Sequence, residues 1–154
     1  MTTIQLPHAD AKLVYLALQL HLERPGSELD AESGGPRKDG LTRVEKELEP
    51  QLPMAVANVE LTAGQQERLS SALAAAINQL KSLPLLVAGG QRPPPRFVAV
   101  LQELYPDVAE DPENALPLAG DMVQLRRRIT RLAANQTRAA APAPRPWWQV
   151  WRRD

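Results

Sequence analysis

The residues most able to do chemistry are four arginines in one short stretch near the end of the chain. They are Arg126, Arg127, Arg128 and Arg131. The guanidinium group is always charged, and its fork of N–H donors matches the oxygens of a phosphate. Four of them within six residues are therefore candidate phosphate-binding groups, facing either lipid headgroups or nucleic acid. The alternative is a solvated basic face on a helix, the more common outcome for a run of charges.

A second candidate site lies at the C-terminus, where all three tryptophans of the chain stand next to arginines. We expect these residues to bind a partner: Trp147, Trp148, Trp151, Arg152 and Arg153. A free tail has no folding reason to carry so much aromatic area. Trp and Arg are enriched in the hot spots of protein–protein interfaces, and they also suit an anionic membrane surface. A third alternative is a tail that folds back into a groove of its own body.

The apolar residues between 118 and 132 predict the helix that carries the four arginines. Leucines, Met122 and Ile129 recur at spacings of four, three, four and three, which places them on one stripe of an α-helix. The arginines lie off this stripe. Pro117 is expected to open the helix, and the segment 139–146 (AAAPAPRP) to form an extended linker, because proline lacks an N–H donor. The chain thus divides into a helical domain, 1–137, and a linker with tail, 138–154.

Charge is distributed unevenly along a chain whose net charge is zero. Residues 1–122 carry 10 Lys and Arg against 17 Asp and Glu, a balance of −7, whereas residues 123–154 carry 8 against 1, a balance of +7. This asymmetry indicates a basic arm that binds an anionic surface, or that lies on its own acidic body. With 154 residues, no secretory signal and no long apolar run, the chain is expected to be one soluble, cytoplasmic domain that is at most peripheral to a membrane.

Periodicity along the rest of the chain predicts an all-α fold, an irregular bundle of about five helices with an extended C-terminal tail. The helices before the basic one are expected near residues 8–23, 41–49, 63–83 and 96–105. The first is apolar over so wide an arc that it is either central to the fold or half of an oligomer interface. Its His21 is expected to be a hydrogen-bonded residue rather than a metal ligand. A polar segment, 27–39, is expected to be a solvent loop.

Two local features make sharper predictions. Thr62 and Gln65 have the spacing of a capping box, so a helix should begin directly after Thr62 and end at Pro84. Segment 54–61 has the β-branched content of a short strand, with 83–87 as its only plausible partner.

No motif for a reaction is present. There is no nucleophile elbow, no paired histidines for zinc and no dinucleotide fingerprint, and no cysteine is available as a nucleophile or thiolate ligand. We therefore expect no cofactor and no metal. The sequence favours a non-enzymatic interaction module that binds a protein partner or a second copy of itself. A peripheral membrane-surface or nucleic-acid binder is the alternative, and a small-molecule enzyme comes third.

Overall fold

A computed structural model describes residues 2–29, 32–36 and 39–140 of the chain, with the side chains of the last helix described up to Leu132. This part is all-α in class, as predicted, with six α-helices and one two-stranded sheet. The elements in chain order are β1 (Thr2–Pro7), α1 (His8–Glu23), α2 (Thr42–Leu48), the 3-10 turn η1 (Glu49–Gln51), β2 (Val56–Leu61), α3 (Ala63–Ala88), α4 (Pro95–Leu104), α5 (Pro106–Glu110), the 3-10 turn η2 (Pro112–Asn114) and α6 (Ala115–Ala140).

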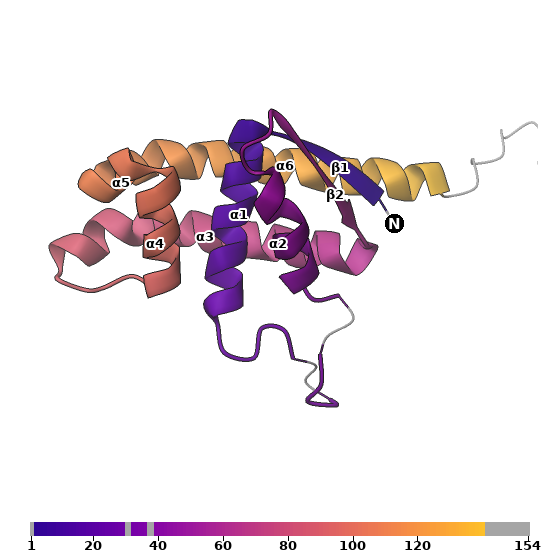
Figure 1. Ribbon diagram of the computed structural model, residues 1–154, viewed down its shortest axis with the longest axis horizontal. Helices are drawn as coiled ribbons and strands as arrows, with labels where there is room; N and C mark the ends of the chain where they lie inside the picture. Colours follow the sequence, from indigo (N-terminus) through magenta and orange to yellow (C-terminus); the bar gives the residue numbers. More distant parts are fainter. Residues whose placement is uncertain (1, 30–31, 37–38, 141–154) are drawn as a thin grey trace, which may run out of the picture.

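Two long helices, α3 and α6, lie side by side and antiparallel, and α1, α2 and α4 cross them on one side (Figure 1). The apolar arc of α1 lies at the centre of this arrangement, with Leu16, Ala17 and Leu18 completely buried. Helices α3 and α4 pack directly on α1. The chain's own helices therefore cover the surface that we considered for an oligomer interface, so α1 is central to the fold.

The sheet pairs β1 with β2 in antiparallel register, Ile4 lying opposite Val59 and Leu6 opposite Ala57. The predicted strand at 54–61 is present, but its expected partner at 83–87 is wrong, because those residues belong to the end of α3. The true partner is the N-terminal segment, whose alternation rests on only two buried side chains, Ile4 and Leu6. A pattern that short does not stand out from a loop in the sequence.

Helix α3 begins as predicted and ends later than predicted. The Thr62 hydroxyl accepts a hydrogen bond from the Gln65 N–H (3.1 Å), and the Gln65 side chain accepts one from the Thr62 N–H (3.0 Å), which completes the capping box. The helix runs through Pro84 and ends at Ala88. Two residues later, Gly90 adopts a positive φ of 73°. Proline so close to the end removes only one late helical hydrogen bond, while the burial of Leu83 anchors the final turns.

By length and composition α3 could also cross a membrane, with a mean hydropathy of 1.3 in its most apolar window. A core helix meets the same criterion. In this fold α3 packs along α6 and α1, and Leu69, Leu73 and Leu80 are completely buried in the shared core. Its apolar character is therefore explained by the fold.

Helix α6 begins at Ala115, two residues before Pro117, and continues to Ala140. The first two residues of the expected linker, 139 and 140, thus belong to the helix, since alanine favours it and the first proline comes only at 142. The segment 106–110, which lies outside the five predicted helices, forms the short helix α5.

Candidate functional site

The four arginines of α6 do not share one face. Met122, Leu125 and Ile129 are buried on the predicted stripe, while Leu132 at its end is 43% exposed. On one side of this stripe α6 approaches α1 and β1, and on the other it approaches α3. Arg128 lies on the first flank, and Arg126, Arg127 and Arg131 lie on the second. All four arginines are exposed and lie off the apolar stripe, as predicted, but they lie on different flanks of it.

Arg128 is bound by its own protein. Its guanidinium lies 2.9 Å from the carboxylate of Asp10, a residue in the first turn of α1 that is only 8% exposed. Further acids lie on this flank. Burial of the Tyr105 side chain is the main cause that raises its pKa, and the negative charges of Asp121, Asp10 and Asp107 raise it further. A cation in this acidic setting stabilises the fold by neutralising a nearly buried carboxylate. Arg128 is therefore a structural residue rather than a free phosphate ligand.

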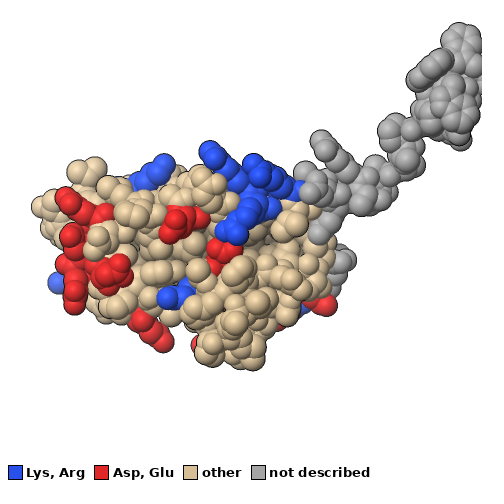
Figure 2. All heavy atoms as spheres, turned by 90° about the horizontal axis from the view of Figure 1, so that it is seen from above, with Lys and Arg blue, Asp and Glu red and all other residues tan. Residues whose placement is uncertain are grey.

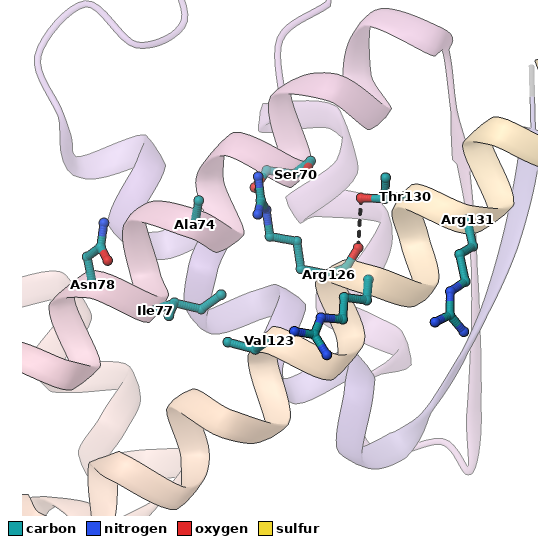
Figure 3. A pocket seen from close by; sticks show the side chains of 9 residues that line it. Ser70, Ala74, Ile77, Asn78, Val123, Arg126, Thr130 and Arg131 are labelled. Carbon is teal, nitrogen blue, oxygen red and sulfur yellow. Dashed lines mark hydrogen bonds between the residues drawn. The ribbon is translucent and has the colours of Figure 1, made fainter.

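The other three arginines line a groove of about 630 Å³ between α3 and α6 (Figure 3). Helix α3 contributes Ser70, Ala74, Ile77 and Asn78, and α6 contributes Val123, Arg126, Arg127, Thr130 and Arg131. The Arg126 Nε donates to the carbonyl oxygen of Ser70 (3.0 Å), which holds that side chain across the groove. The small side chain of Ala74 leaves the space open. Ala74 and Asn78 thus form part of the α3 wall of the groove.

No aspartate or glutamate lines this groove. Among the described residues, neither Arg127 nor Arg131 forms an ion pair. Figure 2 shows how charge is separated over the molecule: basic residues gather near the end of α6, and acidic ones gather at the opposite end, where α5 lies. The acids of α5, of η2 and of the residue between them are Asp107, Glu110, Asp111 and Glu113, all exposed. The groove is thus a locally positive surface without a counter-charge of its own.

The sheet next to the Arg128 flank has two outer edges, and they differ. The edge of β2 is covered by side chains of α2 and η1. Gln51 exchanges hydrogen bonds with both the N–H and the C=O of Asn58 (2.9 and 3.0 Å), and Arg43 donates to the C=O of Glu60 (3.1 Å). The Glu60 N–H reaches the Glu47 carboxylate (3.4 Å). These side chains satisfy the backbone groups that a further strand would need.

The outer edge of β1 has no such cover. Thr3 and Gln5 lie opposite Glu60 and Asn58, so their N–H and C=O groups point away from β2. Within the described part of the chain, nothing bonds to these four groups. Beside this edge lies a small apolar hollow of about 80 Å³ between β1 and α6, to which Leu125, Ile129 and Leu132 contribute. An open edge with apolar side chains next to it is a template for another strand.

One polar cluster was not found from the sequence. Arg68 of α3 donates to the Ser27 carbonyl and lies 3.8 Å from Asp39 and 3.2 Å from His21 Nε2. His21 Nε2 is also 3.1 Å from the Glu28 carboxylate, which accepts hydrogen bonds from the N–H groups of Leu41 and Thr42. His21 is therefore hydrogen-bonded, as predicted, and Glu28, within the expected solvent loop, is anchored to the start of α2. The spacing of Glu28 from Leu41 gives no local signal for this capping role.

Burial, rather than charge, dominates the electrostatics of His21. Desolvation lowers its pKa, the hydrogen bond to Glu28 opposes that shift, and Arg68 adds to it. Arg68 has only donors, so in the neutral ring Nε2 accepts from Arg68. In that state Nε2 has no hydrogen to donate to Glu28, and the Glu28 carboxylate binds the start of α2 through the N–H groups of Leu41 and Thr42. No group of three or more His, Asp or Glu that could hold a metal occurs among the residues described.

The predicted partner-binding residues of the tail, Trp147 to Arg153, lie outside the described residues. Comparison of the chain with protein-family models, with curated proteins and with solved structures found no match. Any account of its function therefore depends on its own surfaces.

Proposed function

We propose that this chain is a non-enzymatic protein-interaction module of the cytoplasm that docks through the open edge of β1, with its Trp/Arg tail as the docking segment. The tail of one copy adds to β1 of the same or a second copy. The observation that carries this proposal is the difference between the two sheet edges. Side chains cover the edge of β2, whereas the N–H and C=O groups of Thr3 and Gln5 on β1 have no hydrogen-bond partner in the described part of the chain.

Strand addition to an exposed edge is a general mode of peptide recognition, in which backbone hydrogen bonds give affinity and alternate side chains give specificity. Segment 147–151 has the sequence Trp-Trp-Gln-Val-Trp. Aromatic and β-branched residues are those that fit a half-buried strand. Every second side chain of an added strand would face the apolar hollow beside Leu132, which is exposed without such cover.

The tail is long enough for this contact. From Leu132 to Ala140, α6 extends about 12 Å at 1.5 Å per residue. The six residues 141–146 can span up to roughly 20 Å, so residue 147 can return to the edge of β1. The acidic end of the body lies near the start of α6, about 39 Å from the other end of that helix. This distance is at the limit of what the basic tail can span when it is fully extended. The acids of its own α5 are therefore a poor target for the tail, whereas β1 is close.

Tryptophan fluorescence of the full chain tests the proposal, because all three tryptophans are in the tail. We expect a blue-shifted emission that is protected from quencher. A Gln5→Pro substitution removes the free edge N–H without touching the β1–β2 ladder, so it should shift the emission to the red. Gln5→Ala keeps the N–H and is the matched control. Circular dichroism verifies that both variants stay folded.

Dilution separates the two arrangements of the tail. A red shift on dilution means that the tail docks on a second copy, and an emission that does not depend on concentration means that it docks on its own body. A spectrum of exposed indole at every concentration would refute tail docking. Equal spectra for Gln5→Pro and Gln5→Ala would refute the edge of β1 as the site.

A second candidate function is peripheral binding to an anionic membrane surface or to nucleic acid through α6 and the tail. It is favoured by the gathering of basic side chains near the end of α6, where the tail begins (Figure 2). The two candidates differ in their response to salt. Binding to phosphates weakens steeply as salt rises, whereas strand addition with apolar contacts changes little. Tryptophan emission with anionic vesicles or duplex DNA, at low and high salt, distinguishes them.

A further inference from the structure

The groove between α3 and α6 has the size and chemistry of a binding site for a small anion. Its volume of about 630 Å³ lies within the range of about 300–1,000 Å³ that is typical of small-molecule sites. It is an open groove on the flank of α6 that faces away from β1. Tail docking at β1 and ligand binding here are therefore separate properties.

The donors that line this groove are nearly all cationic. Within the described part of the chain, Arg127 and Arg131 each retain five N–H groups, and Arg126 retains four after its Nε donates to Ser70. The hydroxyl hydrogen of Thr130 is used by the Arg126 carbonyl (2.9 Å), so the neutral residues add only the Asn78 amide and the Ser70 hydroxyl as donors. Guanidinium groups bind phosphate with two parallel hydrogen bonds.

The floor of the groove differs from its rim. Ala74, Ile77 and Val123 form an apolar strip between the two helices, while the arginines come from one helix only (Figure 3). A ligand that fills the groove must therefore place anionic groups along α6 and tolerate apolar contact on the side of α3. Among the residues that the structure describes, no carboxylate lines the rim beside these arginines.

We propose that the α3/α6 groove binds a small molecule that carries two or more phosphate groups, held by Arg126, Arg127 and Arg131. Arg128, the fourth arginine of the cluster, takes no part because it is bound to Asp10 on the opposite flank. Two or more phosphates are required because three guanidinium groups without a counter-ion exceed the charge that one phosphate neutralises well. The source is either a free phosphorylated compound or the headgroup of a phosphorylated lipid.

Titration calorimetry of the full chain with inorganic pyrophosphate and with inositol trisphosphate tests this site. We expect saturable binding at low salt. Arg127→Gln and Arg131→Gln should each weaken it by about tenfold or more, because each removes a charge-assisted hydrogen-bonding group. Arg128→Gln removes the same charge from the same helix on its other flank, and should change the affinity less than about threefold, as expected from screening at the surface.

A steric variant supplies independent evidence. Ala74→Met fills the groove from α3 without changing any charge, so it should weaken binding even though all three arginines remain. If Arg128→Gln weakens binding as much as Arg127→Gln, the effect belongs to the overall charge of α6 and the site is refuted. Failure of both ligands to bind at low salt refutes it as well.

The source of the phosphates is found by comparing free inositol trisphosphate with vesicles that contain phosphatidylinositol bisphosphate. Binding to the free compound alone identifies a soluble ligand, and binding to both, with the same loss in Arg131→Gln, identifies a lipid headgroup. If Arg127→Gln and Ala74→Met leave the binding to vesicles unchanged, the contact lies elsewhere on the protein and the proposal is overturned.

Discussion

Arginines of two kinds occur in this fold, and they differ in what surrounds the guanidinium. Arg68, Arg96 and Arg128 each lie within 4 Å of a carboxylate and connect elements that are far apart in the sequence. Arg126, Arg127 and Arg131 line a groove without any carboxylate. The first set connects elements of the fold through ion pairs, whereas the second set forms the phosphate site that we propose.

Neighbouring positions on one helix can belong to different sets. Arg127 and Arg128 are adjacent in the sequence, and a helix turns by about 100° from one residue to the next. This turn places Arg128 toward Asp10 of α1 and Arg127 toward α3. Substitutions of equal chemistry at the two positions should therefore have different consequences, and the following predictions measure that difference.

The largest effect on stability is expected at Arg68. Its side chain is only 13% exposed, and it contacts Asp39, His21 and the Ser27 carbonyl. An Arg68→Met substitution should lower the free energy of unfolding by about 2–3 kcal/mol, because it leaves three partly buried acceptors without their donor. Lys81→Met on the exposed side of the same helix is the control, and should change stability by less than about 0.5 kcal/mol. Urea unfolding measures both, and equal effects would contradict the structural role of Arg68.

A smaller loss is expected when the ion pair on α6 is broken. Arg128→Gln should lower the free energy of unfolding by about 1–2 kcal/mol, since the nearly buried Asp10 carboxylate loses its cation. The loss is limited because Asp10 lies in the first turn of α1, where the helix dipole favours a negative charge. A double-mutant cycle with Asp10→Asn isolates the coupling of the pair. A coupling energy near zero would mean that the ion pair adds nothing to stability.

The pH dependence of stability should report on His21 next to Arg68. Burial lowers its pKa below the ordinary value of 6.5, so between the folded pKa and 6.5 the unfolded state binds more protons. Stability therefore falls as the pH is lowered through this window. The melting temperature from pH 7.5 to 5 measures the slope, and His21→Gln should reduce that slope whatever its effect at pH 7.5. An unchanged slope would exclude His21 as the titrating group.

Much of the fold was predictable because its signals are local. The capping box of Thr62 and Gln65, the wide apolar arc of α1 and the stripe of Met122, Leu125 and Ile129 each depend on residues a few positions apart. Side-chain direction on a helix follows directly from such spacings. These elements were therefore predicted with nearly correct ends.

Features that depend on distant contacts were missed or misassigned. The pairing of β1 with β2 joins residues 49 to 59 positions apart, and the capping of α2 by Glu28 spans thirteen. The same limit applies to the candidate site. Four arginines could be identified from the sequence. Asp10 lies 118 positions before Arg128, so only the fold reveals that Asp10 neutralises one of the four.

The smallest predicted change is a gain in the free energy of unfolding, whereas Arg128→Gln is predicted to lower it. Arg127 and Arg131 stand four residues apart on α6, a spacing at which like charges destabilise a helix by about 0.2–0.5 kcal/mol. Neither has a carboxylate partner among the described residues that its loss would leave unpaired. Arg131→Gln should therefore raise the free energy of unfolding by a few tenths of a kcal/mol at low salt, and by less at 1 M salt, where charges are screened over about 3 Å. Thermal unfolding at the two salt concentrations, next to Arg128→Gln, measures the contrast. A loss of stability in Arg131→Gln would mean that this arginine also stabilises the fold, which would remove the distinction between the two flanks of α6.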